Sequence, residues 1–239
     1  QAKSFKRRLC RAPWINSKAS KTDMFAGSPG KMCTASFATR KALKLAVVAC
    51  IKLSPEGDCL DGPHGPIGDW DVSRVTDMDE VFNNARSFNG DISQWDVSSV
   101  TITSGMFEGA TSFNIDISKW EVLSAVDMSG MFSGAAAFNG DISKWDVSSV
   151  SLMPSMFYGA TSFKGDISMW DVSNVKYMNR MFSGAQLFNS DVSLWDVSRV
   201  ADMNELFDHA TSFNIDISKW DVSSVATTSA TFAGATAFS

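Results

Sequence analysis

Acidic side chains that could bind a cation recur along most of the chain in two rows with a 25-residue step. The first row is Asp91, Asp116, Asp141, Asp166, Asp191 and Asp216, and the second is Asp71, Asp96, Glu121, Asp146, Asp171, Asp196 and Asp221. Carboxylates stacked ~5 Å apart repel one another, so each needs solvent, a hydrogen-bond donor or a cation. A calcium ladder is one interpretation of the two rows.

The other interpretation needs no metal. In it the first row bonds the amides of turns, and the second row faces water beside lysines. Lys119, Lys144 and Lys219 each precede a member of the second row by two residues, on the same face of an expected strand. These lysines favour the second interpretation, and we expect no cofactor and no bound metal.

Aspartate, serine and histidine are all present, but a catalytic triad needs a base beside its nucleophile. His64 lies in a turn rich in glycine and proline, and His209 deviates from the repeat at one position. Both are expected to be surface residues. We therefore expect a protein that is not an enzyme.

The four cysteines precede the repeats: Cys10, Cys33, Cys50 and Cys59. Their spacing matches no zinc pattern. Cys50 and Cys59 could form a disulfide or remain free thiols. The chain begins with Gln1, so we expect it to be processed or incomplete.

The charge is divided unevenly along the chain. Residues 1–60 hold 12 Lys/Arg and 3 Asp/Glu, a net charge of +9, whereas residues 61–239 hold 9 and 23, a net charge of −14. An acidic array argues against nucleic-acid binding along the repeats. No apolar run approaches the ~20 residues of a transmembrane helix.

A fixed period explains why the acidic rows exist. Tryptophan recurs at positions 70, 95, 120, 145, 170, 195 and 220, and two phenylalanine registers keep the same step. A fixed period of this length is typical of a solenoid. We therefore expect a repeat array over residues 67–239.

Each repeat has the pattern of a strand followed by a short helix. Trp95-Asp96-Val97-Ser98 alternates large apolar with small polar residues, which predicts a strand with Trp95 and Val97 inward. Apolar residues at steps of three and four, Met128 to Phe138 in the third repeat, predict one or two helical turns. The predicted fold is an α/β solenoid of seven such turns with a parallel sheet.

The segment Phe88-Asn89-Gly90-Asp91-Ile92-Ser93-Gln94-Trp95-Asp96-Val97-Ser98-Ser99-Val100, together with the Met-x-x-Met-Phe-x-x-Ala-x-x-Phe pattern, resembles the BspA-like family of leucine-rich repeat proteins. Valine stands where such repeats usually have asparagine. The resemblance spans about residues 40–239. It implies a binding or adhesion module and supplies no catalytic residues.

Two segments precede the repeats. Residues 1–39 are a basic tail that is expected to be disordered alone. Residues 40–53 have one apolar stripe, with Thr39 as a cap and Pro55 and Gly57 after the end, and predict an N-terminal capping helix within a lead-in segment, residues 40–66. A membrane-surface helix is the alternative for residues 40–53.

Departures from the repeat consensus indicate where a partner could bind. Outward positions are mostly small or polar, but the fifth and sixth repeats carry Met169, Tyr177, Leu187 and Leu194. Exposed apolar neighbours suggest a contact site, and neutral drift in a redundant array is the alternative. The tail adds a dense basic cluster for an acidic protein or anionic lipid: Lys3, Lys6, Arg7, Arg8 and Arg11.

Three functions are compatible with these features. The first is a non-catalytic protein-interaction scaffold, an accessory subunit docked in a larger assembly through its tail and repeat surface. The second is a secreted or cell-surface adhesion module, supported by the resemblance. An enzyme is the weakest alternative. The compartment stays open between an organellar complex and the cell surface.

Overall fold

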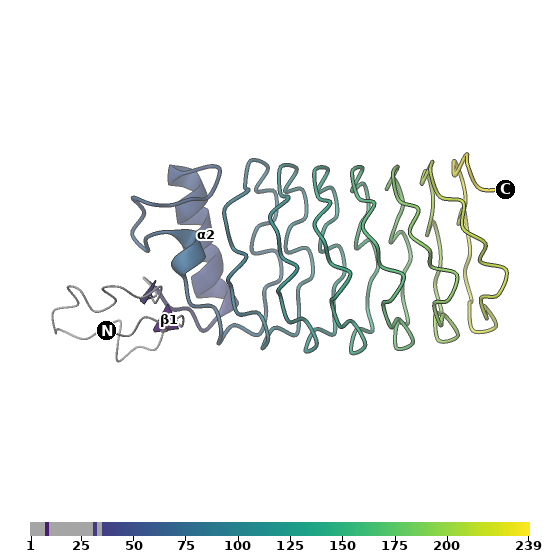
Figure 1. Cartoon of the computed structure of the whole chain (residues 1–239), viewed down its shortest axis with the longest axis horizontal. Helices are drawn as coiled ribbons and strands as arrows, with labels where there is room; N and C mark the ends of the chain where they lie inside the picture. Colours follow the sequence, from purple (N-terminus) through teal and green to yellow (C-terminus); the bar gives the residue numbers. More distant parts are fainter. Residues whose placement is uncertain (1–7, 10–30, 33–34) are drawn as a thin grey trace, which may run out of the picture.

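The computed structural model describes residues 8–9, 31–32 and 35–239. Two short strands, β1 (Arg8–Leu9) and β2 (Lys31–Met32), pair in parallel. They are followed by α2 (Arg40–Leu53) and a short 3-10 helix, η1 (Ile67–Asp69). From residue 70 onward the chain winds into successive coils stacked along one axis (Figure 1).

The helix predicted over residues 40–53 is confirmed as α2. The Thr39 side chain accepts a hydrogen bond from the Ala42 N–H at 3.3 Å, which satisfies one of the free donors at the helix start. Cys50, in the last turn of α2, forms a disulfide with Cys59 that ties the following loop to the helix. Of the two alternatives that the sequence left open for these cysteines, a disulfide or free thiols, the structure has the disulfide. Cys10 and Cys33 lie outside the described residues.

We define a coil as the residues from one repeat tryptophan to the next, so that coil 1 is residues 70–94 and coil 7 is residues 220–239. Equivalent residues of neighbouring coils form single parallel bridges, from Asp77 paired with Ile102 to Asp202 paired with Thr227. These isolated bridges do not extend into strands. The described part of the repeats therefore contains no sheet.

One wall of each coil, residues 76–86 in coil 1, is held to the next coil by a backbone ladder. Alternate N–H groups donate to the following coil, as from Glu80 to the Ser104 carbonyl and from Phe82 to the Met106 carbonyl, both at 2.9 Å. The intervening N–H groups close tight turns within the coil, as from Val81 to the Met78 carbonyl. We call this side the ladder wall.

The ladder wall is where the prediction of short helices is wrong. Two residues of each coil adopt left-handed backbone, for example Glu80 at φ 54° and Asn84 at φ 57°. A left-handed residue every four positions interrupts a right-handed helix and turns alternate N–H groups out of the coil. The apolar steps of three and four therefore arise from linked turns that keep one buried side.

The second long wall, represented by residues 91–100 at the junction of coils 1 and 2, shows that the predicted strands are wrong. Trp95 and Val97 are buried as expected, at 3% and 4% exposure. The backbone, however, folds into turns, closed by the Trp95 N–H on the Ile92 carbonyl and the Val100 N–H on the Val97 carbonyl. Alternation of inward and outward residues was correctly predicted, but extended strands were not.

Side chains join the coils along this second wall. The indole N–H of Trp120 donates to the Ile92 carbonyl at 3.2 Å, and the same bond recurs from Trp95 to Trp220. An asparagine ladder runs beside it, in which the Asn89 side-chain oxygen accepts the Asn114 N–H at 2.9 Å. These side-chain hydrogen bonds link neighbouring coils, as backbone hydrogen bonds link neighbouring strands in a sheet.

The core between the walls is a stack of aromatic rings. The ring centroids of Phe157 and Phe163 lie 4.0 Å apart within coil 4. The ring centroid of Phe157 lies 5.7 Å from that of Phe182 in the next coil. All three side chains are fully buried. Offset stacking adds to the burial of apolar area and fixes how one coil sits on the next.

The predicted parallel-sheet α/β fold of the leucine-rich-repeat kind is therefore wrong. The repeat period, the inward residues and the stacking of equivalent positions are present, but turns replace both the strands and the helices. The reason is local: Asp-x-Ser turns and left-handed residues bend the chain before a strand or helix can extend.

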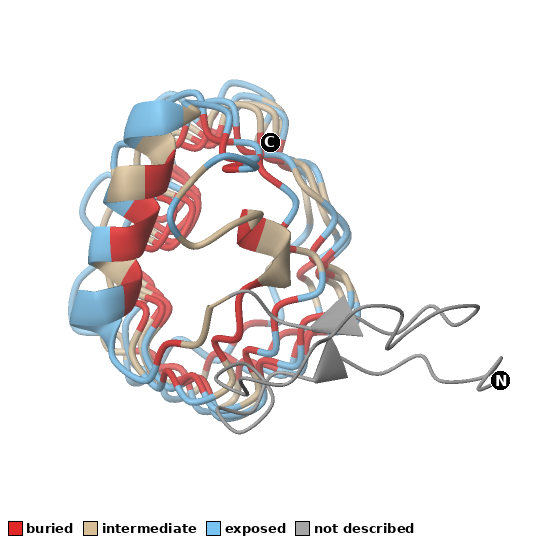
Figure 2. Ribbon diagram, turned by 90° about the vertical axis from the view of Figure 1, so that its left-hand side faces the viewer, coloured by how far each residue is buried: buried red, intermediate tan, exposed pale blue. Residues whose placement is uncertain are grey.

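The two ends of the array differ. At the N-terminal end Phe37 lies 5.1 Å from the Trp70 ring, and the buried side of α2 belongs to the same core as coil 1 (Figure 2). In coil 7, Val222 is 50% exposed, although Val197 one coil earlier is buried. Thr231, in a column held by methionine in coils 2 to 5, donates to the Met203 carbonyl.

Candidate functional site

The most exposed apolar side chains of the array are Met169, at 85%, and Leu194, at 84%. We call them the apolar pair. They are the last residues of coils 4 and 5, so they occupy one column of equivalent positions. The other members of this column are exposed and polar: Gln94, Lys119, Lys144 and Lys219. The apolar pair therefore interrupts a polar column at two adjacent coils.

Carboxylates border the apolar pair on both sides. Asp166 accepts the Ser168 N–H at 3.0 Å, and Asp191 and Asp196 bond the serines two residues after them in the same way. Hydrogen bonds from these serines lower the pKa of all three carboxyls. The borders of the apolar pair are therefore anionic at neutral pH.

Both acidic rows bond turn amides, whereas the metal-free interpretation assigned this role only to the first row. Asp141 accepts from Ser143 and Asp146 from Ser148, each at the backbone N–H and the hydroxyl. In the described part of the chain, no group of three His, Cys, Asp or Glu side chains is arranged to hold a metal ion. The carboxylates act as turn caps within the coils.

The remaining predicted contact residues do not join the apolar pair. Tyr177, 44% exposed, forms bridges with Leu152 and Asp202 on the ladder wall. Leu187, 49% exposed, lies one residue before the buried Phe188. Tyr177 and Leu187 occupy two other columns of the coil, so the four predicted positions form three separate sites.

A strip of exposed apolar residues near Tyr177 was missed by the sequence analysis. Ile102 and Val126 are 36% and 44% exposed, and the Val126 carbonyl accepts the Leu152 N–H. Leu152 is bridged in turn to Tyr177. The sequence contained a signal for this strip. The position equivalent to Ile102 is aspartate in coils 1, 3 and 6, so a comparison of each coil with the repeat consensus would have identified Ile102 as an exposed apolar departure.

The predicted basic cluster lies mostly beyond what the structure describes. Arg8 contributes its backbone to β1. The other four residues lie outside the described residues: Lys3, Lys6, Arg7 and Arg11. The tail contact consequently stays a prediction.

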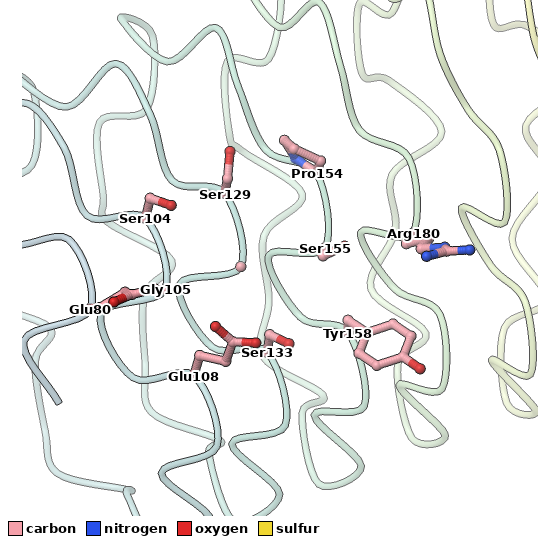
Figure 3. A pocket seen from close by; sticks show the side chains of 11 residues that line it. Glu80, Ser104, Gly105, Glu108, Ser129, Ser133, Pro154, Ser155, Tyr158 and Arg180 are labelled. Carbon is pink, nitrogen blue, oxygen red and sulfur yellow. The ribbon is translucent and has the colours of Figure 1, made fainter. Parts of the chain in front are cut away.

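A polar trough of about 490 Å³ crosses the ladder wall from coil 1 to coil 5 (Figure 3). Its floor consists of small residues of coils 2 to 4: Ser104, Gly105, Ser129, Gly130, Ser133 and Ser155. Glu80 and Glu108 lie at one end, and Tyr158 and Arg180 lie toward the other. Polar groups on a narrow floor suit a hydrogen-bonding ligand better than an apolar one.

The charged groups of the trough already have partners. Glu80 pairs with Lys44 of α2 at 3.0 Å, and Arg180 makes a two-point ion pair with Glu205 at 2.8 and 2.9 Å. Hydrogen bonding to Glu205 raises the pKa of Arg180. Both ion pairs are partly exposed, so they organise the trough more than they stabilise the fold.

The histidines do not form a nucleophile–base pair. The Ser183 hydroxyl donates to Asp208 at 3.4 Å, and His209 contacts the other oxygen of the same carboxylate at 2.7 Å. Serine and imidazole thus share an acid without bonding each other. His64 instead packs edge-on against Phe37 and Trp70, with ring centroids 5.5 and 5.8 Å away.

Comparison with known proteins assigns the chain to a family. Among the described helices, none has the length and apolar character to cross a membrane. A search of curated proteins finds no match. One family model matches residues 60–164 and again residues 137–239, well over half of the chain. These two matches support the predicted relation to BspA-like repeats but not the leucine-rich repeat motif. The chain belongs to the family described as Mycoplasma protein of unknown function, DUF285.

Proposed function

We propose that the protein is a non-catalytic interaction scaffold that docks into a larger protein assembly through the apolar pair. The observation that carries this proposal is the exposure of Met169 and Leu194, at 85% and 84%, in a column otherwise held by lysine and glutamine. Burying two such side chains against a partner contributes about 1.5–3 kcal/mol each. Methionine is also enriched in protein interfaces, where lysine is depleted.

The array suits this role because it holds the apolar pair on a rigid support. Behind Met169, Trp170 donates its indole N–H to the Ile142 carbonyl, and behind Leu194, Trp195 donates to the Ile167 carbonyl. Side chains held on such a support lose less conformational freedom on binding than side chains on a mobile loop. The anionic borders add selectivity for a partner whose rim is basic.

The basic tail would supply a second, electrostatic contact with an acidic surface of the same assembly. High salt should weaken that contact and leave the apolar one nearly unchanged. Salt dependence thus separates the two contributions in one binding experiment.

The matched test exchanges both residues for the lysine that other coils carry. Met169→Lys with Leu194→Lys copies Lys119 and Lys144, so the variant should fold with unchanged stability. We expect the immobilised full chain to retain a partner from its native source, and the purified partner to bind the variant at least tenfold more weakly at both low and high salt. Equal affinity for the two proteins would show that the apolar pair is not the interface.

The polar trough favours a second candidate, a surface adhesion module that binds a polar ligand. Tyr158 offers an exposed ring beside the serine floor, and Tyr177, equally exposed, lies outside the residues that line the trough. The chain has only these two tyrosines. Ligand binding that Tyr158→Ala abolishes and Tyr177→Ala preserves would support adhesion, as would an export signal on the full transcript.

A further inference from the structure

Helix α2 has apolar residues on both sides, although only one side packs against the array. Leu43, Val47 and Cys50 are buried against the core. On the opposite side Leu45 is 62% exposed and Val48 is 57% exposed. Figure 2 shows the buried residues of α2 facing the coils and the exposed ones facing away. A helix on a protein surface normally places charged or polar residues on its outer side.

The exposed residues form one stripe with two lysines. Lys41, Leu45, Val48 and Lys52 follow one another at steps of four, three and four, which places them on the same face of a helix. All four are exposed. We call them the outer stripe of α2. It runs nearly the whole length of the helix, with a cation toward each end.

The two lysines of the outer stripe are free to bind an anion. The sequence of α2 has four basic residues and no acidic one. Arg40 pairs with Asp77 and Asp79, and Lys44 pairs with Glu80. Lys41 and Lys52 make no ion pair with any residue that the structure describes.

Two further leucines near the end of α2 are exposed. Leu53, the last residue of α2, is 65% exposed, and Leu60 is 64% exposed. Leu60 directly follows Cys59, whose disulfide to Cys50 holds this loop at the helix. Helix α2 and the loop after it thus expose four large aliphatic side chains.

We propose that the outer stripe of α2 is a contact surface for the anionic face of a lipid bilayer. The aliphatic side chains would enter the boundary between headgroups and acyl chains, and Lys41 and Lys52 would reach the headgroup phosphates. The stripe lies on a convex helix and contains neither aromatic residues nor arginine. Such a composition is poor in the residues that anchor protein interfaces, which favours lipid over an acidic protein.

The charge of the whole chain sets the orientation of the bound molecule. The first 60 residues carry a net charge of +9 and the remainder −14. An anionic surface therefore attracts the N-terminal end and repels the array. The apolar pair, bordered by aspartates, would stay directed toward solvent and accessible to a protein partner. The proposal is independent of the scaffold function, because a different surface carries it.

The test is co-sedimentation of the full chain with vesicles of phosphatidylcholine alone and of phosphatidylcholine with phosphatidylserine at three to one. We expect binding to the mixed vesicles and little binding to the neutral ones. Leu45→Ser with Val48→Ser should lower the partition coefficient about tenfold or more. Lys41→Gln with Lys52→Gln should lower binding to the anionic vesicles only.

A control removes two apolar residues that are even more exposed, but lie elsewhere on the molecule. Met169→Ser with Leu194→Ser should leave vesicle binding unchanged, and circular dichroism should show that both serine variants remain folded. The proposal is overturned if the wild type does not bind anionic vesicles. It is equally overturned if Leu45→Ser with Val48→Ser binds them as the wild type does, which would assign the binding to the basic tail alone. Binding of acidic polyglutamate, but not vesicles, through the same residues would identify an acidic protein as the partner.

Discussion

At the scale of single residues, the repeat tryptophan has two roles that can be separated. Trp145 is 3% exposed, and its indole N–H donates to the Ile117 carbonyl at 3.2 Å. The ring fills the core, and the indole N–H adds a second donor to a carbonyl that also accepts the Trp120 N–H at 3.0 Å. The same residue thus supplies packing and a bond to the preceding repeat, in which Ile117 lies three residues before the equivalent Trp120.

We expect Trp145→Ala to lower the free energy of unfolding by about 3–5 kcal/mol, because it leaves a cavity. Trp145→Phe keeps most of the packing but removes the indole hydrogen bond to the Ile117 carbonyl, which still accepts the Trp120 N–H, and should cost about 0.5–1.5 kcal/mol. Urea unfolding of both variants measures the difference. A cost below 1 kcal/mol for the alanine variant would contradict the burial of this side chain.

At the scale of elements, the aspartate turns make the second wall sensitive to acid. Hydrogen bonds from serine lower the pKa of eight aspartates in the repeats below the usual 3.8: Asp116, Asp141, Asp146, Asp166, Asp191, Asp196, Asp216 and Asp221. A carboxyl with a lowered pKa in the folded state binds fewer protons than in the unfolded chain. Its stabilising effect is therefore present above pH ~3.8 and is lost as the pH falls through the lower, folded-state value.

The matched variant is Asp141→Asn with Asp146→Asn. The asparagine oxygen can still accept the N–H of Ser143 or Ser148, but the side chain does not titrate. We expect the melting temperature of the variant to fall less steeply than that of the wild type below about pH 4. Parallel curves for the two proteins would show that these turns do not contribute to acid sensitivity.

At the scale of the whole molecule, protection of the backbone should decrease toward coil 7. In coil 4 the Phe157 N–H donates to the Met181 carbonyl at 2.9 Å. The equivalent N–H groups of coil 7 have no acceptor among the described residues: Thr228, Ala230, Phe232 and Gly234. Each coil is stabilised by its neighbours, so a coil with one neighbour opens most easily.

Hydrogen exchange measures this gradient directly. We expect the amides of residues 226–235 to exchange at least tenfold faster than those of residues 151–160 under native conditions. Trp145→Ala should raise exchange in coils 3 to 5 more than in coils 1 and 7, because damage spreads through nearest-neighbour contacts. Uniform exchange along the array would contradict this view of its stability.

Much of the architecture could be predicted from the sequence, because burial follows the repeat. The columns of Trp145 and Phe157 face inward because large apolar side chains leave water at any backbone conformation that allows it. The bounds of α2 were equally readable, since Thr39 caps its start and Pro55 follows its end. The exposure of Met169 and Leu194 followed from the same alternation.

Only the tertiary structure decided how the backbone connects these positions. Apolar steps of three and four fit a helix and a series of linked turns equally well, and the choice depends on where alternate N–H groups find acceptors. In this protein they find them on the next coil, as the Glu80 N–H does on the Ser104 carbonyl. The Cys50–Cys59 disulfide and the outer stripe of α2 were likewise undecided, because each depends on which side of the helix the array covers. A sequence records which side chains avoid water, but hydrogen bonds between segments distant in the chain form only once the coils are stacked.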